Sequence, residues 1–292
     1  MKRWIDRNTK WILTVPLILF ILLMVGYPLY YTVDMSLHSS SMSLVKPPKW
    51  VGFDNYTKLF KNAKFWDACG HTLLFAGVCL ACQTVLGLGF ALILNRRFRG
   101  QNLVRTLFIL PVVATPVAVA MVWKMIYDPA LGIINMLIKQ AGGSAFAFLG
   151  ERSTALWALM LVEIWQNTPV VMLICLGGLA AIPTDSLEAA CIDGASAWQR
   201  LTRITLPLLS PTILTAMMLR LIDVLKAYDI IYSTTQGGPG TSTQTINVMI
   251  YKQAFENFKF GDSSATIVVF FIVLVLIAVS FNQIRKRTVV DY

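Results

Sequence analysis

Long apolar runs constrain the fold of this sequence more than any other feature. Several of them reach about 20 residues, the length at which a helix crosses a hydrocarbon core of about 30 Å. Only 14% of the 292 residues are charged and 56% are hydrophobic, whereas soluble domains are about a quarter charged. The sequence therefore predicts an all-α, polytopic membrane protein, and one domain over residues 1–292 accounts for its length.

The apolar runs predict six transmembrane helices with polar loops between them. An even number of spans places both termini on the same side of the membrane. The predicted spans cover residues 11–33, 71–94, 104–127, 154–180, 207–227 and 264–284.

The distribution of positive charge orients these spans. Both terminal tails and the loops 95–105 and 181–206 together hold 13 Lys and Arg in about 55 residues, against 9 in about 99 residues of the opposite loops. Because cytoplasmic loops are enriched in Lys and Arg, the termini are predicted to be cytoplasmic. The net charge of +10 lies at span ends, so we expect membrane lipid rather than nucleic acid as its partner.

The cysteines and histidines of the sequence do not form a pattern typical of a metal or redox site. Cys79 and Cys82 form a CxxC pair, but they lie inside an apolar span with no second pair nearby. His38 and His71 are far apart along the chain. We therefore interpret the cysteines as small buried residues and expect no metal site and no catalytic residues.

The polar segment 183–207 lies between the fourth and fifth apolar runs and is predicted to form two short helices. Asp185 is placed to cap the first helix, and Gly194 can end it because glycine adopts a left-handed conformation at low cost. A second helix is expected to start near Ser196. Pro207 then opens the next apolar run at a helix start, where its missing N–H is tolerated.

The same segment resembles the cytoplasmic coupling loop of importer-type ABC permeases, which reads Glu-Ala-Ala, three residues, Gly, nine residues, Ile, one residue, Leu-Pro. Every spacing of that pattern is kept. The resemblance implies a coupling helix between spans four and five that docks on a separate ATPase. The residues implied in this coupling are Glu188, Ala189, Ala190, Asp193, Gly194, Ile204, Leu206 and Pro207.

Further motifs resemble the MalF-type subgroup of carbohydrate ABC permeases. Val51–Tyr56 is similar to the stretch that follows the first span in that subgroup. Tyr228–Pro239 is similar to its signature after the fifth span, with Tyr228 in place of Phe and Ser233–Gln236 in place of the usual Leu-Thr-x-Gly run. The other matching residues are Asn95, Gly100, Arg105, Pro111, Tyr251, Ala254 and Phe255.

Polar residues inside the spans are candidates for a solute path, because such groups face a bundle interior or a water-filled cavity. The run 163–169 of span four contains Glu163, Trp165, Gln166, Asn167 and Thr168. Hydrogen bonding between helices is the alternative role. The resemblance implies that the solute contacts the helices flanking the coupling loop, through Gln166, Asn167, Val170, Arg220, Asp223, Val224 and Ala227.

Arg220 is expected to lie well inside the bilayer, so it needs a partner or water. Asp223, one turn further on, is the obvious partner for a structural ion pair. Alternatively, Arg220 faces the cavity and offers its donors to an anionic group on a sugar. In the third span, Pro111 and Pro116 are both expected to produce kinks.

The combined prediction is a membrane permease subunit of an ATP-driven importer for a sugar. The sequence holds no GxxxxGK[ST] phosphate loop, so ATP and Mg²⁺ are expected on a separate ATPase dimer. The resemblance further implies a second permease subunit, an extracytoplasmic solute-binding protein and a bacterial inner membrane. A non-sugar solute, a self-contained secondary carrier and a membrane enzyme are the alternatives. No repeat between the two halves supports the carrier, and no cluster of acid, base and nucleophile supports the enzyme.

Overall fold

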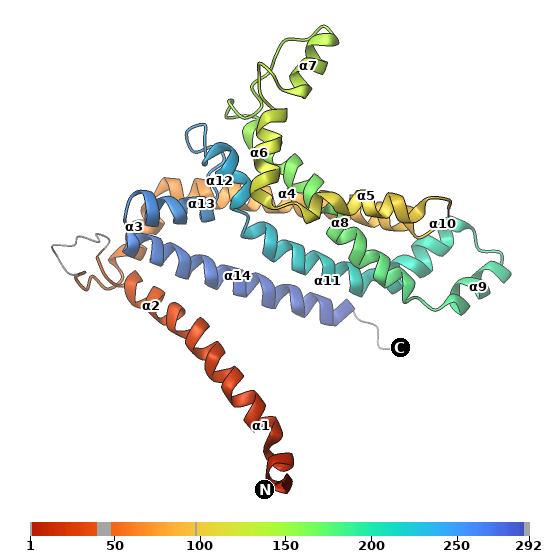
Figure 1. Cartoon of the computed structure of the whole chain (residues 1–292), viewed down its shortest axis with the longest axis horizontal. Helices are drawn as coiled ribbons and strands as arrows, with labels where there is room; N and C mark the ends of the chain where they lie inside the picture. Colours follow the sequence, from red (N-terminus) through yellow and green to blue (C-terminus); the bar gives the residue numbers. More distant parts are fainter. Residues whose placement is uncertain (1, 40–47, 97, 289–292) are drawn as a thin grey trace. The chain divides into compact units, whose positions relative to one another are not determined.

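The computed structural model describes residues 2–39, 48–96 and 98–288, and Figure 1 shows that these form helices joined by turns and loops. Within these residues, five helices are long and apolar enough to cross a membrane, and a sharply bent helix pair makes a sixth if it is counted as one span. No described residue belongs to a β-strand, and His38 and Trp50 form an isolated bridge. The predicted fold class, all-α and polytopic, is confirmed.

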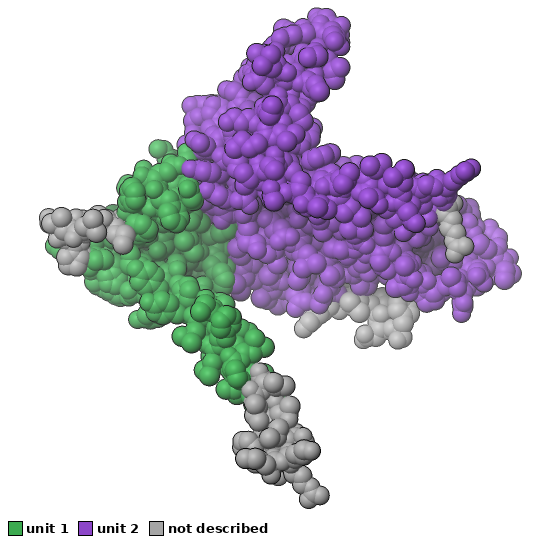
Figure 2. All heavy atoms as spheres, in the orientation of Figure 1, with its two compact units in different colours: residues 1–65, 249–272 green, residues 66–248, 273–292 purple. Residues whose placement is uncertain are grey.

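The chain divides into two compact units, which Figure 2 distinguishes by colour. One comprises residues 1–65 and 249–272, and the other comprises residues 66–248 and 273–292. The helices are α1 Lys2–Ile21, α2 Tyr27–Ser36, α3 Asp54–Lys61, α4 Ala63–Leu94, α5 Gln101–Val113, α6 Pro116–Ile126, α7 Ile133–Gln140, α8 Ala155–Ala180, α9 Thr184–Ile192, α10 Ala197–Arg200, α11 Leu206–Leu225, α12 Asp229–Thr235, α13 Ile246–Tyr251 and α14 Phe260–Thr288.

In the larger unit, α8 packs against α5 and α11, and α6 packs against α12. Two glycines allow close approach. A Cβ on Gly87 of α4 would lie 2.7 Å from Val171 of α8, and one on Gly178 of α8 would lie 2.7 Å from Leu209 of α11. Small residues at helix contacts are the usual means of tight association in membranes. Buried side chains of all three helices form the core there.

The third span is broken rather than kinked. Helices α5 and α6 meet at 96°, and the break lies at Ala114 and Thr115, both of which are extended. Thr115 precedes Pro116, and the helical region is disfavoured for a residue before proline. Pro111, in contrast, lies inside α5, and the break falls next to Pro116 instead.

The fifth span begins earlier than predicted. Helical residues run without interruption from Ala197 to Leu225, with a π-helical turn at Leu201–Thr205 just before Pro207. Helix α11 begins at Leu206 and carries Pro207 in its first turn, where a missing N–H is tolerated. The prediction that Pro207 lies at a helix start is therefore confirmed, although a π-helical turn precedes that start.

Two of the sequence motifs stabilise helix ends. At the end of α2, Asn55 Nδ2 donates to the carbonyl oxygens of Ser36 at 2.8 Å and His38 at 2.7 Å. At the end of α4, Arg105 Nη2 and Gln101 Nε2 donate to the carbonyl oxygen of Leu94 at 2.8 and 2.6 Å. Free carbonyls at a helix end need such partners, so these motif residues have a structural role.

Candidate functional site

A buried polar cluster joins three membrane-spanning helices around Arg220 of α11. Arg220 Nη2 lies 2.7 Å from Oε1 of Glu163 on α8. Arg220 Nε donates to Oε1 of Gln83 on α4 at 3.1 Å. Arg220 and Glu163 are each 5% exposed and Gln83 is fully buried. The surrounding described residues therefore shield most of the ion pair from water.

Glu163 gathers donors from both neighbouring helices and its own. Gln83 Nε2 donates to the Glu163 carbonyl oxygen at 3.1 Å, and Asn167 Nδ2 donates to Glu163 Oε1 at 2.9 Å. A buried ion pair is stable only when further hydrogen bonds satisfy its remaining atoms. We call Gln83, Glu163, Asn167 and Arg220 the polar cluster.

Asp223 is a secondary partner of Arg220. Its Oδ2 lies 3.4 Å from Arg220 Nη1, and its side chain is 57% exposed. The predicted Arg220–Asp223 ion pair is present, but the closest carboxylate, Glu163, comes from a different helix. Sequence spacing places residues on one helix face, but it does not predict which side chain a neighbouring helix supplies.

A polar pocket of about 190 Å³ lies beside the cluster. Its walls come from the start of α6, the middle of α8, the end of α11 and the start of α12. The lining residues are Pro116, Glu163, Gln166, Asn167, Arg220, Asp223, Lys226, Ala227, Tyr228, Asp229 and Ile230.

Gln166 links this pocket to the break in the third span. Its Nε2 donates to the carbonyl oxygen of Ala114 at 3.1 Å, one of the groups that the break releases from the helix. Because a carbonyl oxygen only accepts, the amide atom of Gln166 that faces it must be the nitrogen, and the other atom is the oxygen Oε1. Gln166 is 3% exposed, and its buried Oε1 has no hydrogen-bond partner among the described residues.

The structure brings together most of the predicted solute-path residues. Gln166, Asn167, Arg220, Asp223 and Ala227 all line the polar pocket. Val170 and Val224 lie outside its lining; Val224 is buried and Val170 is half-buried.

Sequence reasoning missed Gln83, Tyr228 and Asp229 as members of this region. Gln83 is an isolated amide in an otherwise apolar span. Polar side chains at such depth need polar partners, and that signal was available. Asp229 carried no comparable signal, because its place in the pocket depends on the turn from α11 to α12.

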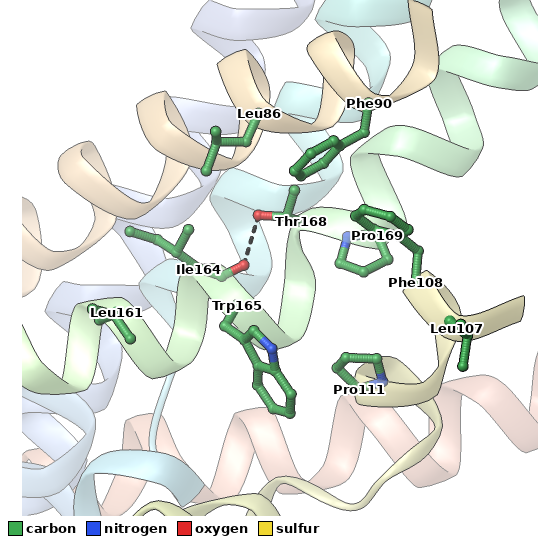
Figure 3. A pocket seen from close by; sticks show the side chains of 10 residues that line it. All are labelled: Leu86, Phe90, Leu107, Phe108, Pro111, Leu161, Ile164, Trp165, Thr168 and Pro169. Carbon is green, nitrogen blue, oxygen red and sulfur yellow. Dashed lines mark hydrogen bonds between the residues drawn. The ribbon is translucent and has the colours of Figure 1, made fainter. Parts of the chain in front are cut away.

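The polar run of span four divides between two faces of α8. Glu163, Gln166 and Asn167 line the polar pocket. Trp165, Thr168 and Pro169 face an apolar pocket of about 450 Å³ between α4, α5 and α8, which Figure 3 shows from close by. There the Thr168 hydroxyl donates to the Ile164 carbonyl oxygen at 2.6 Å instead of to another helix. Residues 163, 166 and 167 share a face because helical neighbours are three or four positions apart.

In segment 183–207, helix α9 ends in a Schellman motif around Gly194. The Gly194 N–H donates to the Cys191 carbonyl oxygen at 3.1 Å and the Ala195 N–H donates to the Ala190 carbonyl oxygen at 2.9 Å. Gly194 has φ +76°, which favours glycine. The prediction that Gly194 ends the first helix is confirmed.

The two helix starts of this segment differ. Helix α9 follows Pro183 without a side-chain cap, so the prediction that Asp185 caps it is wrong; Asp185 lies inside the first turn. At α10 the predicted start near Ser196 is confirmed. Ser196 Oγ accepts from the Gln199 N–H at 3.2 Å, and the Ser196 N–H donates to Gln199 Oε1 at 2.8 Å, a capping box.

Segment 183–207 is largely exposed. Ile192 and Trp198 are 87% and 71% exposed, and Glu188, Ala189, Asp193 and Pro207 are exposed as well. Ala190 is buried, and Ile204 and Leu206 are half-buried. Apolar side chains this exposed on an ordered segment are typical of an interaction surface.

Comparison with known proteins identifies the family of the chain. Residues 83–288 match the family described as "Binding-protein-dependent transport system inner membrane component". The match covers well over half of the sequence, and the chain belongs to this family. It is therefore a transport subunit rather than an enzyme, and the predicted resemblance to MalF-type ABC importer permeases is confirmed.

Individual relatives agree with this family assignment, and a solved structure agrees with the fold. The chain is 36% identical to the trehalose/maltose transport system permease protein MalF of Thermococcus litoralis, over 92% of this chain and 91% of that protein. It is 31% identical to the sulfoquinovosyl glycerol transport system permease protein SmoG of Agrobacterium fabrum, over 97% and 93%. A bacterial ABC transporter that imports alginate has the same fold, with a TM-score of 0.85 at 24% identity, covering 98% and 99%.

Proposed function

We propose that this chain is the membrane permease of an ABC importer for a sugar and that the polar pocket is its part of the solute path. The observation that carries the proposal is the pocket itself, a set of amides and charged side chains inside membrane-spanning helices. Such groups supply the paired donors and acceptors that sugar hydroxyls need. The relatives named for trehalose, maltose and sulfoquinovosyl glycerol support a sugar as the solute.

In this proposal the chain works with separate subunits. The exposed segment 183–207, with Glu188 and Gly194, docks on a cytoplasmic ATPase dimer that binds ATP and Mg²⁺. A second permease completes the path and an extracytoplasmic binding protein delivers the sugar. One related solved structure is a complex of the alginate transporter with a periplasmic protein. Both termini lie in the cytoplasm of a bacterial cell, as the Lys and Arg distribution favours.

The test is sugar uptake by the complete transporter with Asn167→Ala and with Asp223→Ala. Each change removes a polar group from the pocket, and we expect the half-saturating sugar concentration to rise about tenfold, equivalent to the loss of about 1.4 kcal/mol. Basal ATP hydrolysis should stay unchanged. Thr168→Val is the matched control, because Thr168 is on the same helix but faces the apolar pocket. Unaltered uptake by both pocket variants would place the solute path elsewhere.

A further inference from the structure

Three hydrogen-bond acceptor groups belong to residues that line the polar pocket. Gln166 Oε1 is buried without a partner in the described part of the chain. The carboxylates of Asp223 and Asp229 are exposed along the same pocket. Acceptors such as these are satisfied by a ligand that donates hydrogen bonds, and an ionised carboxylate accepts only.

Arg220 is not available as an anion receptor. Three acceptors already engage its guanidinium: Glu163 at 2.7 Å, Gln83 at 3.1 Å and Asp223 at 3.4 Å. The guanidinium is also nearly inaccessible, with a side chain that is 6% exposed. An anionic solute that took the place of Glu163 beside Arg220 would leave that carboxylate buried and unpaired, which is strongly unfavourable.

The remaining charges of the pocket also disfavour an anion. Arg220 and Glu163 neutralise each other. The other charged residues of the lining are two carboxylates, Asp223 and Asp229, and one ammonium, Lys226. A carboxylate or sulfonate on the solute would therefore meet an excess of negative charge. Like charges brought together in a recognition site oppose binding and exclude unsuitable partners.

We infer that the pocket selects neutral, hydroxyl-rich sugars and excludes acidic ones, with Asp223 and Asp229 as the residues that determine this specificity. The inference rests on the proposed function, since it assigns a substrate class to the same pocket. The hydroxyl groups of a neutral sugar donate to Gln166 Oε1 and to the two carboxylates, whereas an anionic substituent offers only acceptors there.

The experiment measures uptake by the complete transporter for neutral sugars and for their acidic counterparts. The panel contains neutral mono- and disaccharides, trehalose and maltose among them, together with uronate and sulfonate derivatives including sulfoquinovosyl glycerol. We expect uptake of the acidic sugars to be at least about tenfold slower than that of the preferred neutral sugar. In the double variant Asp223→Asn with Asp229→Asn, the ratio of acidic to neutral uptake should rise at least about tenfold.

A matched control and the single variants make the result decisive. Glu151→Gln removes an exposed carboxylate that does not line the pocket and should leave the ratio unchanged. Asp223→Asn and Asp229→Asn made separately should each raise the ratio, which covers the case in which the double variant does not assemble. The binding protein is the same in every assay, so a change in the ratio comes from this chain.

Two outcomes would overturn the inference while leaving the proposed function intact. One is uptake of an acidic sugar by the unmodified transporter as fast as that of any neutral sugar. The other is a ratio that neither the double nor the single variants change. Absence of uptake for every sugar of the panel would instead contradict the proposed function, so the two failures are distinguishable.

Discussion

The polar cluster and segment 183–207 hold polar residues in opposite ways. In the cluster, Arg220 and Glu163 are each 5% exposed and bond to side chains of other helices. In the segment, Glu188 and Asp193 are exposed, and backbone bonds such as those around Gly194 define the shape. The cluster depends on packing between distant parts of the chain, whereas the segment depends on local hydrogen bonds. Substitutions should therefore act on assembly in the first case and on local conformation in the second.

Removing one charge from the cluster should have the largest effect. Glu163→Leu leaves Arg220 buried without its closest partner, and breaking a buried pair in this way costs about 3–5 kcal/mol. We expect the amount of assembled transporter in the membrane to fall at least tenfold, measured by quantitative blotting and size-exclusion chromatography of detergent extracts.

The exchanged pair is the control for this prediction. Arg220→Glu combined with Glu163→Arg keeps one positive and one negative charge at the two positions and should restore part of the assembly. The other exchange, Arg220→Asp combined with Asp223→Arg, should not restore assembly. The Asp223 side chain is exposed and its Oδ2 lies 3.4 Å from Arg220 Nη1, so it is the weaker partner. Normal assembly and uptake by Glu163→Leu alone would show that the ion pair does not hold these helices together.

The end of α9 should be the next most sensitive position. Gly194 has φ +76° and nothing lies within 4 Å of a Cβ built there, so a side chain is disfavoured by the backbone rather than by crowding within the chain. Gly194→Val should destabilise this turn by about 1–2 kcal/mol. We expect uptake, and the stimulation of ATP hydrolysis by the loaded binding protein, to fall severalfold while the complex still assembles.

Gly194→Asn separates conformation from contact, because asparagine tolerates the left-handed region better than other side chains. It should retain more activity than Gly194→Val if the backbone turn is what matters. Equal loss in both variants would indicate that a surface docked on this turn leaves no room for any side chain.

The capping box of α10 should have the smallest effect. Ser196→Ala removes the acceptor for the Gln199 N–H, and loss of an N-cap costs about 1 kcal/mol. Hydrogen exchange of the amides at 197–205 should speed up about fivefold, with sugar uptake reduced by no more than about twofold. Thr202→Ser, which keeps the hydroxyl in the same region, serves as the control. Unchanged exchange after Ser196→Ala would mean that contacts with neighbouring helices, not the box, stabilise this start.

Sequence alone determined the features that depend on composition and local spacing. Long apolar runs predicted the membrane helices, since the length of a span is fixed by bilayer thickness. The intact pattern from Glu188 to Pro207 predicted the ABC permease family, which the match over residues 83–288 confirms. Gly194 predicted the end of α9 because few residues adopt its backbone conformation readily.

Tertiary structure alone decided which distant residues meet. Arg220 lies closer to Glu163 and Gln83, which are 57 and 137 positions away, than to its helical neighbour Asp223. Of the two prolines in the third span, Pro116 lies at the break and Pro111 lies inside a helix. Gln166 Nε2 donates to the carbonyl oxygen of Ala114 at that break. The physical reason is the same in each case. A buried polar group is stabilised by whatever partner the packing of helices brings within hydrogen-bonding distance, and that packing depends on the whole bundle rather than on the local sequence.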